Sequence, residues 1–328
     1  MERTRILVTG GAGYIGSHTC KALSAVGFEP VTVDSMVRGH EWAVQWGPLV
    51  KADIRDVDAM TATFEKYRPA AVIHFAAFIE VGESVADPAT FYDNNVWGTL
   101  CLLRAMQRGN CPNIVFSSSA AVYGTPEQTP IREDHPLNPI NPYGRTKLMM
   151  EQIMADFDPA YGTHHVALRY FNAAGADPDG GIGEAHNPET HLVPLAIGSA
   201  LKTRGHLKVF GQDYDTPDGT CVRDYVHVSD LAQAHVASVR YLLDGGKSTA
   251  LNLGTGTGNS VLEIIEAVHR AGGVAVPYEN AVRRAGDPAR LVATSTKAQS
   301  VLGWEPKYTD IDTIVQTAWR WHLSRKDA

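Results

Sequence analysis

A glycine-rich turn between an apolar run and a helical segment constrains this chain more than any other feature. Residues 5–9 are typical of a buried strand, and they lead directly into Gly10-Gly11-Ala12-Gly13-Tyr14-Ile15-Gly16. Residues 17–26 then show helical periodicity and end at Gly27. Residues without a Cβ let backbone amides approach an anion at the start of a helix. The turn therefore predicts a phosphate-binding βαβ unit.

An acidic residue follows this turn at the spacing of a dinucleotide site. Asp34 comes 18 residues after Gly16, at the end of an apolar run. In such a unit the carboxylate accepts hydrogen bonds from the adenosine ribose and repels a 2′-phosphate. Gly10, Gly13, Gly16 and Asp34 therefore predict a dinucleotide site, with NAD favoured over NADP. A glycine-rich turn without a ligand is the alternative, and the flanking strand and helix argue against it.

Apolar runs and helical stretches alternate through the first half of the chain. Such alternation predicts an α/β fold with a doubly wound, parallel sheet of the Rossmann type. The expected strands lie at 5–9, 31–33, 49–50, 71–76, 113–117 and 165–171. The expected helices lie at 17–26, 56–67, 87–108 and 142–157.

The pattern loosens beyond residue 172 into loops rich in glycine and proline, with 177–181 as the clearest break. We expect helices at 191–203, 229–243, 260–271, 296–302 and 311–322, and strands at 207–210, 222–228 and 250–253. The organisation predicted from this change is an NAD-binding domain over residues 1–172 and a mainly substrate-binding lobe over 173–328. The lobe is expected to interleave with the sheet.

Composition narrows the partners and the compartment. The formal charge of −7 argues against nucleic acid, because phosphate backbones bind basic surfaces. Four scattered cysteines fit neither a zinc site nor a disulfide framework, so we expect no metal and a reducing cytoplasm. The first residues lead straight into a strand, and no run approaches the roughly 18 apolar residues of a membrane span. We therefore expect no signal peptide and no membrane anchor.

The stretch Asn141-Pro142-Tyr143-Gly144-Arg145-Thr146-Lys147 carries the strongest candidate for acid–base chemistry. In a helix that begins at Pro142, Tyr143 and Lys147 lie four residues apart on one face. A cation about 4 Å from a phenol, at an effective dielectric of about 20, is worth roughly 4 kcal/mol, or about three pKa units. That shift is nearly what a general base at neutral pH needs. A chance pairing is the alternative, so other motifs have to support this one.

Taken together, the motifs resemble the extended short-chain dehydrogenase/reductase family, and within it the enzymes that invert C4 of UDP-sugars. The resemblance covers essentially the whole chain, and the order and spacing of its motifs are specific. Besides the Tyr143 stretch, it rests on residues 8–18 (VTGGAGYIGSH), 74–77 (HFAA), 81–84 (VGES), 92–96 (YDNNV), 116–124 (FSSSAAVYG), 168–172 (LRYFN) and 222–228 (VRDYVHV).

The resemblance implies a set of residues around the NAD. These are Gly10, Gly13, Tyr14, Ile15, Gly16, Asp34, Ser35, Asp53, Ile54, Phe75, Ala76, Asn94, Ser117, Tyr143, Lys147 and Tyr170. Phe75 and Ala76 could equally be strand core, and an acidic residue such as Asp53 is more often a helix cap. Ile79 stands where some relatives carry a lysine aimed at the cofactor, so that contact is missing or comes from elsewhere.

The chemistry that the resemblance implies is NAD-dependent 4-epimerisation of a UDP-hexose, UDP-glucose or UDP-galactose, through a transient 4-keto sugar. Tyr143 would take the proton of the 4′-hydroxyl while the C4 hydride moves to NAD. Lys147 would lower the pKa of Tyr143 and hold the nicotinamide ribose, and Ser119 would hydrogen-bond O4. Ser119 alone could be a simple cap at the end of its strand. We also expect the pKa of Tyr143 to rise when the cofactor is reduced, because the positive ring is then lost.

The resemblance also implies the substrate contacts. They are Ser119, Tyr143, Phe171, Asn172, His191, Leu192, Phe210, Arg223, Tyr225, Arg284, Asp287 and Leu291. Arg223 and Arg284 would bind the diphosphate, Phe210 the uracil and Asp287 the nucleoside ribose. The alternatives are a solvated surface for the arginines and a structural role for His191. Leu291 occupies the position that controls sugar size, where tyrosine restricts the site to hexoses and a small residue admits N-acetylhexosamines.

Several alternatives stay open at this point. Related dehydratases place an acidic residue in the turn where this chain has Ala120-Ala121, which cannot transfer a proton. Ala121 also replaces a threonine of some epimerases, so one sugar contact is lost. Two other hypotheses remain. The protein could act on UDP-N-acetylglucosamine or a UDP-pentose, or it could be an inactive regulator that senses NAD. The intact Ser119, Tyr143 and Lys147 argue against an inactive regulator. Relatives form homodimers, so we expect one through the helices at 87–108 and 142–157.

Overall fold

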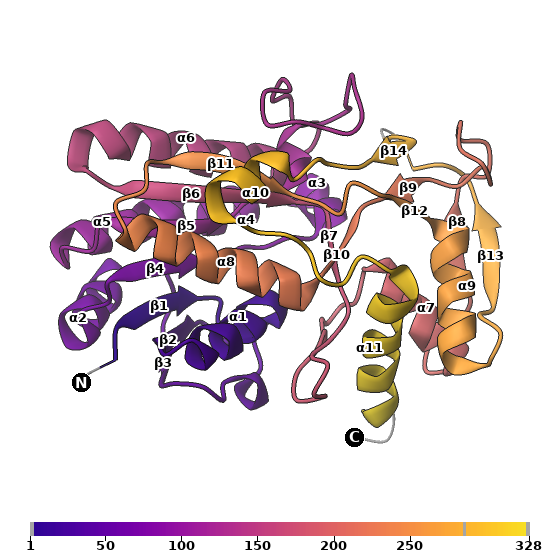
Figure 1. The fold of residues 1–328 in the computed structure, drawn as a ribbon, viewed down its shortest axis with the longest axis horizontal. Coiled ribbons are helices and arrows are strands. Elements are labelled where there is room, and N and C mark those ends of the chain that lie inside the picture. The colour runs from indigo at the N-terminus through magenta and orange to yellow at the C-terminus, as the bar shows by residue number, and fades with distance from the viewer. Residues whose placement is uncertain (1–2, 285–286, 326–328) are drawn as a thin grey trace.

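Seven parallel strands form the central sheet of the protein (Figure 1). The computed structural model describes residues 3–284 and 287–325. In spatial order the strands are β11 (Thr249–Leu253), β6 (His164–Tyr170), β5 (Asn113–Ser117), β4 (Ala71–His74), β1 (Arg5–Thr9), β2 (Glu29–Asp34) and β3 (Leu49–Lys51). The order reverses between β1 and β4, which is where ligands bind in doubly wound sheets. The predicted doubly wound parallel sheet is confirmed.

Helices cover both faces of this sheet. Alternate side chains of β1 show why: Ile6 and Val8 pack into one apolar core, and Leu7 packs into the other. Because successive strand residues point to opposite faces, a strand buried on both sides must be apolar throughout. One face carries α1 (Tyr14–Ala25), α8 (Val228–Leu243) and α10 (Thr296–Leu302). The other carries α2 (Val57–Tyr67), α5 (Gly98–Arg108) and α6 (Pro142–Tyr161).

A smaller lobe lies beyond the carboxyl ends of the strands, on the right in Figure 1. Its apolar core is shared by α7 (Leu192–Ala200), α9 (Val261–Gly272) and α11 (Ile311–Ser324). Its short strands pair as β7 (Asn172–Ala174) with β10 (Tyr225–His227), β8 (Leu207–Phe210) with β13 (Tyr278–Ala281), and β9 (Val222–Arg223) with β12 (Asn259–Ser260) and β14 (Arg290–Leu291). None of the helices in the described part of the chain is long and apolar enough to cross a membrane.

The second half of the chain also contributes to the main sheet. Strand β11 forms its edge beside β6, and α8 packs against α1 on one face. The C-terminal half therefore interleaves with the sheet. A division after residue 172 stays a prediction.

Several elements differ from the sequence prediction, and the short strands β7, β12, β13 and β14 were not predicted. The expected strand 222–228 is divided at Asp224 into β9 and β10. The backbone nitrogen of Asp224 donates to Leu291 of β14, whereas its carbonyl accepts from Asn172 of β7, so the two halves pair with different strands. The expected helix 87–108 consists of α4 (Pro88–Phe91), a π-helical segment (Tyr92–Trp97) and α5. Helix α3 (Val81–Ala86) was not predicted. Its six residues are too short to show a helical period.

Candidate active site

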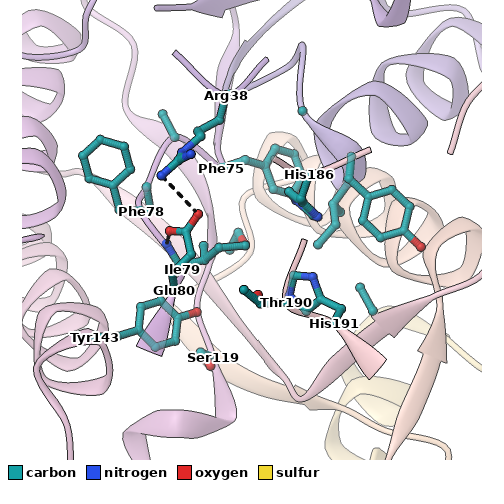
Figure 2. Close-up of a pocket in the computed structure, with 18 of the residues that line it drawn as sticks. Arg38, Phe75, Phe78, Ile79, Glu80, Ser119, Tyr143, His186, Thr190 and His191 are labelled. Carbon is teal, nitrogen blue, oxygen red and sulfur yellow. Dashed lines mark hydrogen bonds and ion pairs between the residues drawn. The ribbon is translucent and has the colours of Figure 1, made fainter. Parts of the chain in front are cut away.

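A cavity of about 1220 Å³ lies between the carboxyl ends of the strands and the lobe (Figure 2). Residues predicted from both halves of the chain meet in its walls. Those lining it are Gly10, Gly13, Tyr14, Ile15, Gly16, Asp34, Ser35, Asp53, Ile54, Phe75, Ala76, Asn94, Ser117, Ser119, Tyr143, Lys147, Tyr170, Phe171, Asn172, His191, Arg223, Arg284, Asp287 and Leu291.

Three predicted substrate residues do not line this cavity. Leu192 and Tyr225 pack into the apolar core of the lobe. The ring of Phe210 lies against the guanidinium of Arg284, with 4.0 Å between the ring centre and the guanidinium carbon. Contacts of these three side chains with a substrate stay predictions.

The glycine turn forms a cradle that excludes side chains. A Cβ at Gly16 would lie 2.2 Å from the carbonyl oxygen of Gly10, and one at Gly10 would lie 2.7 Å from the backbone nitrogen of Ala76. Gly10 also has a φ of +71°, which L side chains rarely adopt. Gly13 is the N-cap of α1 and provides no capping side chain, so the helix presents bare amides to the cavity. This geometry fits the pyrophosphate of a dinucleotide.

Asp34 stands at the carboxyl end of β2, beside the cradle. Its carboxylate accepts hydrogen bonds from the backbone nitrogens of Ala12 (3.1 Å) and Met36 (2.9 Å). Burial raises the pKa of this carboxyl, and the two backbone donors act in the opposite direction. The carboxylate is therefore held rigidly on the cavity wall, where it can accept from ribose hydroxyls.

Asp53 and Ile54 occupy the loop after β3. The helix-cap alternative for Asp53 is wrong, because Asp56 caps α2 by accepting from the backbone nitrogen of Ala59. Asp53 instead pairs with Arg55 at 2.7 Å, and this partner lowers its pKa. Ile54 is buried against Gly98, at the start of α5.

The π-helical segment places Asn94 on the cavity wall and buries its neighbour. The Asn95 side chain accepts from the backbone nitrogen of Phe78 (2.9 Å) and donates to the Phe78 carbonyl (3.0 Å) and to Thr146 (3.1 Å). These bonds tie the loop after β4 to α6. Single π turns often occur at functional sites. Here the π-helical segment directs Asn94 to the cavity and Asn95 into the protein interior.

Helix α6 carries Tyr143 and Lys147 into the cavity. Asn141 caps the helix by accepting from the backbone nitrogen of Gly144 (2.8 Å). A Cβ at Gly144 would lie 2.6 Å from the carbonyl of Ala121, so glycine allows α6 to approach the turn after β5. Ser119, in that turn, lies close to the Tyr143 side chain, as Figure 2 shows, and it lowers the pKa of that phenol. The predicted serine and tyrosine are thus in contact.

Lys147 is positioned through the sheet. Its Nζ donates to the carbonyl of Ser117 at 2.8 Å and lies 5.8 Å from the centre of the Tyr143 ring. Burial lowers the pKa of Lys147 to about 7, although the carboxylate of Glu151 opposes this shift. Ser117 also binds the hydroxyl of Tyr170 at 2.5 Å, and burial raises the pKa of that phenol.

The pKa of Tyr143 departs from the simple expectation. Burial raises it, the hydrogen bond with Ser119 lowers it, and the charge of Glu80 raises it again. Lys147 is not a direct partner of the phenol, because its ammonium points to the Ser117 carbonyl. The expected lowering of the Tyr143 pKa by Lys147 therefore stays a prediction.

Glu80 was not identified from the sequence. Its carboxylate pairs with Arg38 at 3.7 Å and accepts from the backbone nitrogen of Ile79 at 3.1 Å. Arg38 also reaches Glu83 and the carbonyl of Asn187, so it joins the loop after β2 to α3 and to the lobe. Only the tertiary structure brings these segments together, and the sequence contains no signal for the contact.

The lobe side of the cavity contains a pair of predicted residues that bind each other. Arg223 donates a hydrogen bond to the carboxylate of Asp287, with both side chains largely buried. The Asn172 side chain donates to the carbonyl of Asp224 (3.3 Å). Phe171 and Leu291 pack against one buried cluster near Ala120 and Tyr123. Arg223, Leu291 and Tyr143 therefore line the same cavity.

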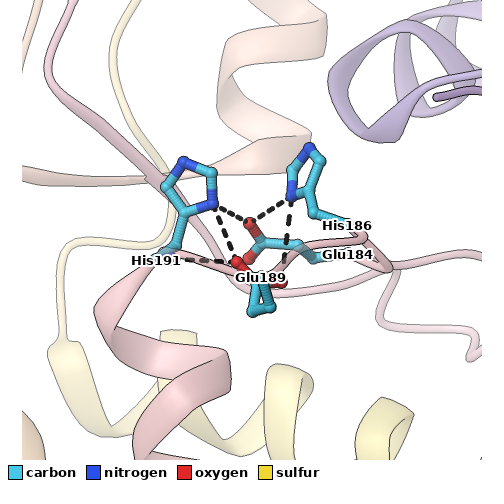
Figure 3. A group of neighbouring side chains, drawn as sticks. All are labelled: Glu184, His186, Glu189 and His191. Atoms are coloured by element: carbon cyan, nitrogen blue, oxygen red, sulfur yellow. Dashed lines mark hydrogen bonds and ion pairs between the residues drawn. The ribbon is translucent and has the colours of Figure 1, made fainter. Parts of the chain in front are cut away.

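A second group that sequence reasoning missed surrounds His191. Glu184, His186, Glu189 and His191 lie together in the loop before α7 (Figure 3). The repeated spacing Glu-x-His-x-x-Glu-x-His could have indicated such a cluster.

Comparisons with known proteins agree with this geometry. Residues 7–317 match the family described as GDP-mannose 4,6 dehydratase. UDP-glucose 4-epimerase of Rhizobium meliloti (strain 1021) is 55% identical over 325 residues, 99% of each chain. The structure of UDP-glucose 4-epimerase from Brucella ovis in complex with NAD has a TM-score of 0.95 and 52% identity, covering 96% of this chain and 97% of that one. The Bifidobacterium longum enzyme in complex with NAD+ and UDP has a TM-score of 0.94 and 40% identity, covering 99% of each chain.

The glycine cradle with Asp34, and Ser119, Tyr143 and Lys147 on the wall of the same cavity, define the class of extended short-chain dehydrogenases/reductases. The similarity extends over nearly the full length of this chain and of each relative described above. Within this class, the chain belongs to the family of the UDP-glucose 4-epimerases.

Proposed function

We propose that this protein is an NAD-dependent enzyme that interconverts UDP-glucose and UDP-galactose by inverting C4 of the hexose. The observation that carries the proposal is the position of the Tyr143 side chain. It lies close to Ser119 and faces the same cavity as the glycine cradle. Direct deprotonation at C4 is costly because that C–H is not acidic. Oxidation to a 4-keto sugar, followed by reduction from the other face, avoids the problem.

The residues of the chain handle the proton in this scheme. NAD, when bound in the cradle, supplies the hydride acceptor and donor. Tyr143 takes the proton of the 4′-hydroxyl as the alcohol becomes a ketone and returns it when the alcohol forms again. Ser119 holds O4 by a hydrogen bond, and Lys147 contributes positive charge next to the phenol. The sugar gains and loses one hydride and one proton, so no net redox change remains.

Elimination by a dehydratase is disfavoured by the turn at Ala120-Ala121. Neither side chain transfers a proton, whereas loss of water from a 4-keto sugar needs an acid and a base near C5 and C6. The acidic residue near Tyr143 is Glu80, and its carboxylate is already held by Arg38 and by the backbone of Ile79. We therefore place epimerisation ahead of dehydration.

One incubation separates these activities. The purified protein is mixed with UDP-glucose without added NAD, and again with NAD, and the products are resolved by chromatography. UDP-galactose supports the proposal, whereas a 4-keto-6-deoxy sugar or no product overturns it. Tyr143→Phe is expected to lose about 10²- to 10⁴-fold in kcat. Unchanged turnover would contradict the role of Tyr143, and it would leave the activity itself intact.

Leu291 is the residue with which to test the sugar size that the site accepts. We propose a preference for hexoses, because Leu291 packs with Phe171 on the cavity wall. A panel of UDP-glucose, UDP-N-acetylglucosamine and UDP-xylose measures it. Leu291→Ala should improve kcat/KM for UDP-N-acetylglucosamine relative to UDP-glucose, and Leu291→Tyr should reduce it. An unchanged ratio in both variants would remove Leu291 from this role.

We propose a homodimer formed through the two helical segments at 87–108 and 142–157. These segments pack side by side, and each exposes a large apolar side chain, Trp97 at 43% and Met149 at 38%. Light scattering at micromolar concentration should give twice the chain mass. Trp97→Glu should give a monomer, and Leu323→Glu on α11 is the matched control. A monomer mass for the unchanged protein would refute the proposal.

The cytoplasm is the proposed location. All four cysteines, Cys20, Cys101, Cys111 and Cys221, are free and buried. Such thiols are typical of a reducing compartment.

A further inference from the structure

We infer that Glu184 and Glu189 are positioning residues that keep His191 as an imidazolium, whose Nε2–H then donates a hydrogen bond to a phosphate oxygen of the UDP-sugar. The inference rests on the proposed function. It adds the two residues that determine the charge of one substrate contact, and it predicts a pH dependence for that contact.

Both carboxylates converge on one nitrogen of His191 (Figure 3). Nδ1 of His191 lies 2.8 Å from Oε1 of Glu184 and 3.1 Å from Oε1 of Glu189. Nδ1 of His186 lies 3.0 Å from Glu184 and 3.8 Å from Glu189. The two imidazole rings therefore lie on the same side of a pair of carboxylates.

The two carboxylates need a positive partner, and the imidazoles can provide it. Both glutamate side chains are only 5% exposed, whereas His191 is 37% exposed and lines the cavity. Across residues 3–284 and 287–325, no lysine or arginine forms an ion pair with either carboxylate. Buried charges are costly unless they are paired. His191 lies 2.8 Å and 3.1 Å from the two carboxylates, so it can act as their counter-charge, and it is open to the cavity.

Other titratable groups near the cluster do not provide the positive charge that the two carboxylates need. Tyr14, on α1, donates its hydroxyl to the carbonyl of Gly175 at 2.6 Å, so it remains a neutral phenol. Burial lowers the pKa of His18 on α1 to about 4, and it also lowers the pKa of His322 on α11. Burial would lower the pKa of His191 too, but Glu184 and Glu189 raise it well above its ordinary value.

The charge decides what the second ring nitrogen can do. Nδ1–H is committed to the carboxylates, so in a neutral ring Nε2 would be an acceptor and would repel a phosphate oxygen. In the imidazolium, Nε2–H is a donor. Within the part of the chain that the structure describes, Nε2 of His191 makes no hydrogen bond. That atom is therefore available to a ligand in the cavity.

The start of α7 supports an anion at this place. His191 is the N-cap residue of this nine-residue helix, and its side chain makes no capping hydrogen bond. The amide dipoles at a helix N-terminus favour negative charge. Arg223 and Arg284 line the same cavity. A diphosphate would thus be met by two arginines, a helix start and the His191 ring.

A first experiment measures the charge directly and does not depend on activity. The full-length protein is labelled with 15N-histidine, and the His191 resonances are assigned by their loss in His191→Asn. The two nitrogens should stay in the imidazolium state from pH 6 to about pH 9. Titration near the ordinary pKa of about 6.5, or below it, would overturn the inference. This outcome is independent of whether the protein epimerises any sugar.

A second experiment measures UDP binding by calorimetry. For Glu184→Gln and for the double variant with Glu189→Gln, we expect UDP to bind about tenfold more weakly at pH 8.5, from the loss of one charge-assisted hydrogen bond, with little change at pH 6. Uridine, which lacks phosphate, should bind equally well in all variants. The matched control is Glu266→Gln, which removes the same charge from an exposed ion pair on α9.

Each other outcome of this experiment counts against the inference. Equal losses for UDP and uridine at both pH values would mean a purely structural role. A divalent metal ion found in the purified protein and lost in Glu184→Gln would mean that the cluster holds a cation instead. If the unchanged protein bound no UDP at all, the proposed function would fail together with the contact. The histidine titration would still report the charge of His191.

Discussion

Replacing Glu151 by glutamine would remove the negative charge from a buried network beneath Tyr143 and Lys147. The carboxylate accepts two hydrogen bonds from Arg169, at 3.0 Å and 2.5 Å, and one from Ser118 at 2.5 Å. The Arg169 and Glu151 side chains are only 6% and 9% exposed. Arg169 also donates to the hydroxyl of Tyr123, which donates to Asn252. The network thus joins α6, β6 and β11 to the turn after β5.

The size of the effect follows from the burial of Arg169. Glutamine keeps the shape of the side chain but leaves a guanidinium charge without a counter-ion, and breaking a buried pair in this way costs about 3–5 kcal/mol. Replacing both partners by apolar residues, Glu151→Leu with Arg169→Met, should cost much less, because no charge is then left buried. The glutamate also raises the pKa of Lys147, so its loss should lower that pKa further below about 7.

Two measurements check this reasoning. Urea unfolding, followed by both tryptophan fluorescence and circular dichroism, should show a loss of about 3 kcal/mol or more for Glu151→Gln and no loss for the exposed control Glu266→Gln. In the pH profile of kcat, the limb due to loss of the Lys147 charge should move to lower pH, because a lower pKa means deprotonation at lower pH. A loss below about 1 kcal/mol, or a double variant as unstable as the single one, would refute the argument.

Three further predictions concern the cofactor and the base. Gly16→Ala would place a Cβ 2.2 Å from the Gly10 carbonyl oxygen, so we expect NAD to bind roughly thirtyfold more weakly, a loss of about 2 kcal/mol. Calorimetry measures this affinity, and Gly205→Ala, at a position with open space around it, is the control. An unchanged affinity for NAD would contradict the proposed cradle. Glu80→Gln should lower the pKa of Tyr143 and move the acid limb of the kcat profile to lower pH. Arg38→Met should raise that pKa and move the limb to higher pH, because it leaves the Glu80 carboxylate without its partner. Shifts in the same direction in both variants would disprove the electrostatic effect of Glu80 on Tyr143. The pKa of Tyr143 should rise when the bound cofactor is reduced, because a positive charge near the phenol is then lost. Titration of the tyrosinate by its ultraviolet absorbance, with Tyr143→Phe as the background, measures this pKa. Equal pKa values in the two cofactor states would rule the prediction out.

Much of the fold and of the cavity wall could be predicted because those signals are local. A strand, three glycines and an acidic residue at a strand end indicate the cradle by their spacing in the sequence. The alternation of apolar runs determines the parallel sheet in the same way. The start of a helix at Pro142 and the four-residue spacing of Tyr143 and Lys147 likewise follow from helix geometry.

The tertiary structure decided how these residues act. It turned Lys147 to the Ser117 carbonyl instead of to the phenol, and it brought Glu80 to Tyr143 and Arg38 to Glu80. It also buried Glu184 and Glu189 behind His191. Charges and pKa values depend on burial and on partners distant in sequence, so no local pattern contains them. The sequence by itself determined the sheet, the cofactor turn and the residue types of the site; packing alone decided their protonation.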